Sequence, residues 1–153
     1  MSVNCEIESA IPSADTPPVS SVLELLERAW EGLLEACHSS TPQERYELAH
    51  LASLRAASAL IAARTTPSGW SRPRSVWELL PAIAPELTEW AIFYSISGRK
   101  RLQFGQPGAS TITSREADDL VRQSERFLEL VRAMLHLPVA SALPSGLAVT
   151  RRS

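Results

Sequence analysis

One segment, residues 41–64 with the sequence TPQERYELAHLASLRAASALIAAR, constrains the fold of this chain more than any other. It begins with a helix start signal, in which Thr41 can act as N-cap, a proline occupies the first helical position and Glu44 completes a capping box. Between residues 48 and 63, Arg55 is the only charged side chain apart from one histidine. A helix that is apolar on nearly every side cannot lie on a surface. The segment is therefore predicted to be the central helix of an all-α bundle.

The same start signal, a serine or threonine followed three residues later by glutamate, occurs four times before apolar residues at helical spacing. A proline can start one further helix, which a glycine would end. No run of residues alternates between apolar and polar as a strand would. The chain is thus predicted to be an all-α, up-and-down bundle of four to five helices. The predicted helices begin at Ser21, Thr41, Ser75, Pro85 and Thr113, the third ending near Leu80 and the fourth at Gly98.

Composition divides the chain into one core and two tails. Residues 1–19 combine serine, threonine, proline and acidic residues with few large apolar side chains, which is typical of disorder. Residues 137–153 contain two prolines and one glycine and show no sustained period. We therefore predict disordered tails at 1–19 and 137–153 and one helical bundle at 20–136. A chain of 153 residues that is 44% hydrophobic has enough apolar side chains for one such core.

Charge and cysteine content exclude several classes of protein. The formal net charge of -2 excludes a strongly basic nucleic-acid binder on bulk charge, although it does not exclude local patches. Cys5 and Cys37 form neither a disulfide framework nor a metal-ligand spacing, which is typical of reduced thiols in the cytosol. The N-terminal segment has no basic residue and no apolar run approaches the ~20 residues that span a bilayer. We expect a cytoplasmic protein without a membrane span, metal or cofactor.

Local positive charge gathers between Arg55 and Arg101. This range holds seven basic residues (Arg55, Arg64, Arg72, Arg74, Arg99, Lys100 and Arg101) against three acidic ones. Trp70 lies among the arginines of one loop, and an aromatic ring beside arginines suits stacking on a base together with phosphate contacts. In the other interpretation, Trp70 packs on the following helix and the arginines only solvate the loops. Both interpretations remain open from the sequence.

Arg55 is the one charge on the apolar face of the central helix, since residues 48, 52, 59 and 62 lie within about 60° of it. Its guanidinium cannot lose its proton, so it needs a carboxylate, carbonyl groups or an anionic ligand. Three arrangements satisfy this need: an internal pair with a glutamate, a side chain that extends to the rim of the bundle, or an anion site.

Arg45 and His50 have the spacing Arg-x4-His within the same helix. Five residues turn a helix by 500°, so the two side chains point about 140° apart and do not form a compact pair within one chain. They could converge only in a cleft that two subunits share. The simpler interpretation places Arg45 near the helix start and pairs His50 with Glu47, one turn earlier. The sequence has no metal-ligand spacing, nucleophile motif or glycine-rich phosphate loop.

Three segments resemble successive helices of the HEPN superfamily, the higher eukaryote and prokaryote nucleotide-binding domain. They are ERYELAHLASLRAASALIAAR, SVWELLPAIAPELTEWAIFYSISGRKR and ITSREADDLVRQSERFLELVRAML. In that superfamily an alanine-rich second helix precedes a helix that ends in a Tyr-x4-Arg-like element, and the last helix begins Thr-x-x-Glu-Ala. Here Tyr94, Arg99 and residues 113–117 stand at these places. The resemblance covers residues 20–136 and is greatest to small stand-alone actinobacterial HEPN proteins, and a single lysine, Lys100, fits a GC-rich genome.

The resemblance implies a bundle of four to five helices, usually dimeric, that binds nucleotides or RNA. It also implies that active members are metal-independent ribonucleases with an Arg-x4–6-His motif near the last helices. In this chain, Arg99 and Arg101 have no histidine four to six positions later. The pair Arg132 and His136 is one residue too close. Arg45 and His50 have the right spacing but lie in another helix.

We therefore expect a non-catalytic HEPN-like bundle that binds RNA, a nucleotide or a partner protein through the positive surface from Arg55 to Arg101. One alternative is a metal-independent, toxin-like HEPN ribonuclease with Arg45 and His50 in a shared cleft. Another is a purely structural helical adaptor. We also expect a homodimer, because the 41–64 helix is apolar on more faces than four neighbours would cover and because the resemblance implies pairing.

Overall fold

The computed structural model describes residues 19–65 and 75–137 of the 153-residue chain. Within these ranges it contains five α-helices, one 3-10 turn and no strand, which confirms the predicted all-α bundle. Residues 1–18, 66–74 and 138–153 lie outside the described residues, and with them nearly all of the two predicted tails. The elements are α2 (Val19–His38), α3 (Pro42–Arg64), α4 (Val76–Ile83), η2 (Pro85–Leu87), α5 (Thr88–Leu102) and α6 (Ser114–Met134).

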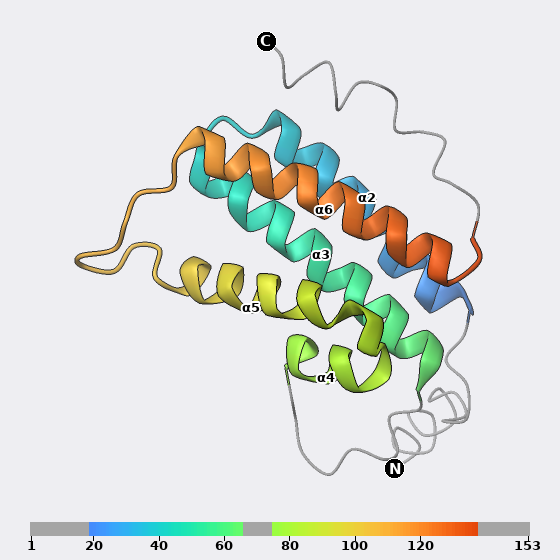
Figure 1. The fold of residues 1–153 in the computed structure, drawn as a ribbon. Coiled ribbons are helices and arrows are strands. Elements are labelled where there is room, and N and C mark those ends of the chain that lie inside the picture. The colour runs from blue at the N-terminus through green and yellow to red at the C-terminus, as the bar shows by residue number, and fades with distance from the viewer. Residues whose placement is uncertain (1–18, 66–74, 138–153) are drawn as a thin grey trace, which may run out of the picture.

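Helix α3 is the centre of the bundle, as predicted. It contacts α2, α4, α5 and α6, and Figure 1 shows α2 and α6 on one side of it and α4 and α5 on the other. The long helices alternate in direction along the chain (Figure 1), so the bundle is up-and-down. Five alanines of α3 are fully buried, and such small side chains let neighbouring helix axes come close. These alanines are Ala49, Ala52, Ala56, Ala57 and Ala59.

Three of the predicted helix starts are confirmed by their capping geometry. The Thr41 hydroxyl accepts a hydrogen bond from the backbone N–H of Glu44 at 3.2 Å, and Ser75 caps α4 in the same way. Thr113 forms the full capping box with Glu116 at the start of α6. Each interaction joins residues three positions apart, so the local sequence is sufficient to specify it.

The predicted start at Ser21 is wrong, because α2 begins at Val19. The Ser-x-x-Glu pattern is also tolerated inside a helix, and nothing between Val19 and Ser21 breaks one. The nearest helix-breaking residues are two prolines immediately before Val19 in the sequence, so the helix continues back to them.

The predicted helix end at Gly98 is also wrong, because α5 continues to Leu102. Gly98 serves packing instead. A Cβ atom at this position would lie 3.3 Å from Cε1 of His50 on α3, which is closer than ordinary van der Waals contact. The absence of a side chain therefore lets α5 approach His50, and the helix accepts the weaker propensity of glycine. The chain turns after α5 through Gly105 and Gly108, both with positive φ.

Aromatic rings join α4, α5 and α6. Trp77 and Tyr94 stack with their centroids 4.8 Å apart, and Phe127 lies 5.2 Å from both Tyr94 and Trp90. Offset and tilted pairs at these distances add to the gain from burying the rings. In the part of the chain that the structure describes, none of the helices is long and apolar enough to cross a membrane.

A buried hydroxyl network lies where α3, α5 and α6 meet. The Ser124 hydroxyl accepts from the hydroxyls of Ser53 at 2.8 Å and Tyr94 at 3.2 Å. It donates in turn to the backbone carbonyl of Ala49 at 3.2 Å. Ser53 and Ser124 have no exposed surface, so water cannot replace these bonds. Burial raises the pKa of the Tyr94 hydroxyl above its ordinary value, which keeps it protonated as a donor.

Replacing Ser124 with alanine should lower the free energy of unfolding by about 1–3 kcal/mol, because buried hydroxyl and carbonyl groups lose a partner. Adding Tyr94→Phe should then cost less than it does alone, since the hydroxyl that it removes has already lost its bond to Ser124. Urea denaturation of the four proteins in this cycle measures both effects. Ser114→Ala, at an exposed position of the same helix, is the control and should change stability little. Additive losses would show that the network does not act as a unit.

Candidate functional site

Arg45 stands at the start of α3, where it ties two other elements to the bundle. Its Nη1 donates to the Asp118 carboxylate of α6 at 2.8 Å, and its Nη2 donates to the Ser39 carbonyl at 3.0 Å. Asp118 lies 73 positions from Arg45 in the sequence, so no local pattern indicates this partner. The guanidinium therefore makes one ion pair and one hydrogen bond to a loop carbonyl. Both join parts of the bundle, so Arg45 has a structural role.

His50 is buried, with 3% of its surface exposed. Its Nδ1 shares a 3.0 Å hydrogen bond with the Ser97 hydroxyl of α5, and its ring meets Trp77 and Tyr94 edge to face. The predicted pairing with Glu47 is wrong, because α5 approaches closely at Gly98 and supplies Ser97 as the partner. Burial, and secondarily the charge of Arg101, lowers the pKa of His50 to about 4. The imidazole is therefore neutral at neutral pH.

The last turn of α5 carries Arg99, Lys100 and Arg101, which do not form one patch. Residues two positions apart on a helix point about 200° apart, so Arg99 and Arg101 face different sides. Arg101 faces α3, where its charge acts on His50. Its Nε atom is buried and has no hydrogen-bond partner among the described residues. Arg99 is exposed.

Lys100 connects the end of α5 to the start of α6 through an ion pair with Glu116. The bond to Lys100, followed by bonds to Thr113, lowers the pKa of the Glu116 carboxyl. Arg115 is exposed beside it in the first turn of α6. We call Arg45, Lys100, Arg101 and Arg115 the positive end of the bundle. Two of these four charges are paired with Asp118 and Glu116, and Arg101 and Arg115 form no ion pair within the described residues.

Among the described residues, Arg55 does not form the internal ion pair that is one of its three predicted arrangements. Its Nη1 donates to the Arg28 carbonyl of α2 at a long 3.4 Å and lies over Gly32, 3.6 Å from where a Cβ would stand. The side chain is partly exposed. It therefore extends across α2 to the rim of the bundle, as long basic side chains do when their stem is buried and their charge reaches water. Nothing about its surroundings indicates an anion site.

Trp70, Arg72 and Arg74, the loop half of the predicted positive surface, lie outside the described residues. Arg64, just before that loop, contacts Glu86 at 3.5 Å. Within the described residues, no group of three histidine, cysteine, aspartate or glutamate side chains is placed to hold a metal ion.

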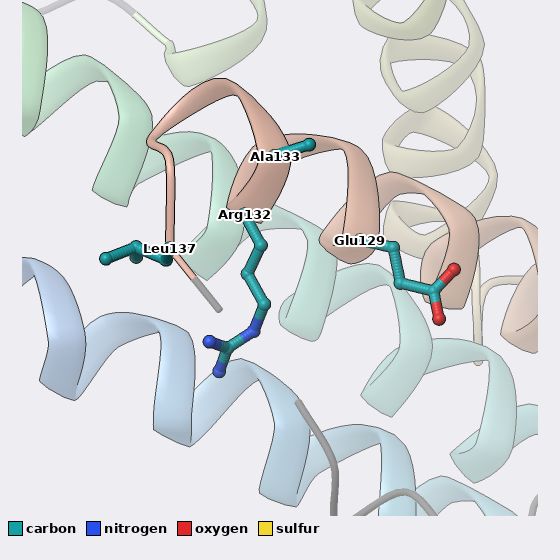
Figure 2. A pocket seen from close by; sticks show the side chains of 4 residues that line it. All are labelled: Glu129, Arg132, Ala133 and Leu137. Carbon is teal, nitrogen blue, oxygen red and sulfur yellow. The ribbon is translucent and has the colours of Figure 1, made fainter. Parts of the chain in front are cut away.

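Two shallow cavities lie on α6. The first, of about 270 Å³, is lined by Glu129, Arg132, Ala133 and Leu137, and Figure 2 shows Arg132 extending from α6 towards α2. The second, of about 320 Å³, lies between α5 and α6 and is lined by Glu89, Trp90, Phe93 and Gln123. Neither contains a histidine. His136, which follows Arg132 in the short-spaced motif, instead lies two residues after the end of α6 and has a positive φ of 58°.

Comparison with protein families identifies the chain. The model of the SAV_6107-like HEPN family matches residues 36–132, which span the end of α2, all of α3 to α5 and all but the last two residues of α6. The chain belongs to this family. Neither the curated proteins nor the solved structures give a significant match. The resemblance to HEPN proteins predicted from the sequence is thus confirmed.

In this HEPN protein, the Arg-x4-His pair does not form a composite site within one chain. Arg45 faces Asp118 and Ser39, whereas His50 faces Ser97, Trp77 and Tyr94. Because the two side chains point about 140° apart on α3, Arg45 reaches the end of the bundle and His50 reaches the core. Ser97 and Asp118, the partners that fix this arrangement, carry no signal of their own in the sequence.

The lowered pKa of His50 predicts how stability depends on pH. The folded-state pKa of about 4 lies below the unfolded value of 6.5, so the unfolded chain binds the proton more readily. Stability should therefore fall as the pH drops from 6.5 to 4, by about 3 kcal/mol from this group. His50→Asn should flatten the curve over this interval.

Chemical denaturation of both proteins between pH 7.5 and pH 4.5 measures the difference, because Glu116 contributes mainly at lower pH. The control is His38→Asn, which removes a histidine from the exposed end of α2 and should leave the slope unchanged. An equally steep slope in His50→Asn would contradict the assignment of this pH dependence to His50.

Proposed function

We propose that this HEPN protein is a non-catalytic bundle that binds single-stranded RNA through its positive end. Membership of a family named for nucleotide binding supports the ligand class. The observation that carries the non-catalytic part of the proposal is the burial of His50. Binding of a free nucleotide, or of a partner protein, at the same surface is the alternative outcome of the tests below.

Ribonuclease chemistry of the HEPN type requires an imidazole that moves a proton and a guanidinium that stabilises negative charge at one phosphate. His50 is 3% exposed and its Nδ1 already shares a hydrogen bond with Ser97. A pKa of about 4 leaves it a weak base, well below the value near the working pH that suits proton transfer. Arg45 is held by Asp118 at 2.8 Å. A phosphate at Arg45 would therefore meet no available imidazole from the same chain.

The positive end carries cationic side chains that can contact the phosphate groups of RNA. Arg101 and Arg115 form no ion pair within the described residues, and Arg115 stands at the N-terminus of α6, where the helix dipole also favours anions. The two paired cations, Arg45 and Lys100, lie partly exposed beside them. The Lys100–Glu116 pair is exposed enough to be weak, so a phosphate group can compete with the carboxylate for this lysine.

Fluorescence anisotropy with a labelled single-stranded RNA of mixed sequence should show binding that weakens steeply between 50 and 200 mM salt, since phosphate contacts release counterions. The variant Arg101→Gln/Arg115→Gln should bind more weakly, and the slope of log affinity against log salt should decrease by about 1.4, or ~0.7 for each lost contact. Arg28→Gln/Arg126→Gln removes two exposed charges elsewhere and is the matched control. Equal losses in both double variants would indicate a general charge effect, and competition by mononucleotides alone would favour the nucleotide.

Purified protein incubated with RNA and a chelator should show no cleavage. Neither His50→Ala nor Arg45→Ala should change this result, because the two side chains serve packing and an ion pair. Gel analysis of end-labelled RNA over several hours provides the measurement, with a known metal-independent ribonuclease as positive control. Cleavage by the wild type that disappears in both variants would establish the ribonuclease alternative, with the two residues meeting across subunits.

A further inference from the structure

The outer face of α5 exposes large apolar side chains that the bundle does not cover. Ile92 is 56% exposed, Ile96 53% and Phe93 39%. Ile92 and Ile96 lie one turn apart and Phe93 lies beside them, so the three form a continuous stripe. The other exposed large hydrophobic residues among the described ones are Leu102, further along α5, and Leu23 and Leu34, which lie about three turns apart on α2. The stripe is therefore the main exposed apolar surface of the described bundle.

The uncovered apolar surface lies on α5 and not on α3, whose apolar faces led to the prediction of a homodimer. From the sequence, the apolar faces of the 41–64 helix were expected to exceed what its neighbours would cover. In the structure α3 contacts four helices, and its large apolar side chains are buried or partly buried. The apolar surface left for pairing is on α5 instead.

Opposite charges stand at the two ends of the stripe. Glu89 lies one turn before Ile92–Phe93 and Arg99 lies one turn after Ile96, and both are exposed. Neither forms an ion pair within the described residues. Along the helix, an acidic side chain is thus followed by two apolar ones and then by a basic one, and the first and last of these lie about 15 Å apart along the helix axis.

This order is self-complementary about its midpoint. We infer that α5 pairs antiparallel with α5 of a second copy of this chain across a twofold axis that passes near Tyr94. In that register Ile92 meets Ile96 of the partner subunit, because both lie two residues from the midpoint. Glu89 meets Arg99 of the partner subunit, because both lie five residues from it. A twofold contact repeats each pair, so one interface contains two apolar pairs and two ion pairs.

The charge pattern selects the direction of pairing. In a parallel arrangement Glu89 would lie beside its own copy, and so would Arg99, which is unfavourable. The antiparallel arrangement turns both repulsions into attractions. The cavity of about 320 Å³ that Glu89, Trp90, Phe93 and Gln123 line borders the stripe on the α6 side and provides a hollow for a side chain of the second copy. RNA binding has no part in this pairing, because Arg101 faces the opposite side of α5.

Sedimentation velocity of the full chain from 1 to 100 µM tests the pairing. The wild type should form dimers, and Ile96→Glu should weaken the dimer at least tenfold while circular dichroism shows an unchanged helix content. Leu34→Glu, the same change at an exposed leucine of α2, should leave the dimer intact. A wild type that stays monomeric at 100 µM would overturn the inference and leave the stripe to another protein. A dimer that Ile96→Glu does not weaken would also overturn it.

A charge-swap series tests the register without disturbing the apolar stripe. Glu89→Arg and Arg99→Glu should each weaken the dimer severalfold, because each places two pairs of like charges in contact. The double variant Glu89→Arg/Arg99→Glu should restore the affinity, because the pairs are re-formed with reversed sign. Failure of the double variant to recover affinity, with both single variants impaired, would rule out the antiparallel register.

Discussion

The burial of α3 on most of its sides is the constraint on which this bundle depends. A helix surrounded by four others must have small side chains where the neighbours come closest, and its alanines meet this need. The same enclosure leaves no room for an unpaired polar group. The polar residues of α3 accordingly either find partners on other helices, as His50 and Ser53 do, or extend to the rim, as Arg55 does.

The enclosure of α3 also decides the chemistry of His50. A histidine near the start of a helix at the edge of a bundle would be exposed to solvent and available for proton transfer. Here Gly98 brings α5 against the ring, Ser97 holds Nδ1, and the aromatic rings of Trp77 and Tyr94 cover its sides. The burial that these contacts produce, together with the charge of Arg101, favours the neutral imidazole over the charged one. The packing that stabilises the bundle is thus the same packing that makes the histidine unsuitable as a base.

Features that depend on neighbours in sequence could be predicted from the sequence, and features that depend on distant residues could not. The caps at Thr41, Ser75 and Thr113 join residues three positions apart, and the apolar length of α3 identifies it as central. The predicted helix end at Gly98 is wrong because a glycine near the end of a helical pattern is the ordinary stop signal. Its actual role is set by His50, and the partner that His50 finds lies 47 positions away. No pattern among neighbouring residues indicates a contact between positions so far apart in the sequence.

Helix α5 packs into the core on one side and is uncovered on the other, and this limits what a single substitution can reveal. Its inner side supplies Tyr94 to the hydroxyl network and Ser97 and Gly98 to His50. Its outer side exposes Ile92 and Ile96, which no helix of the described bundle covers. A change on the inner side alters the core and so shifts the whole helix, whereas a change on the outer side leaves the core contacts in place. In the proposed dimer, a substitution in α5 that weakens pairing without loss of stability must therefore lie on the outer side, which makes the two sides separable by measurement.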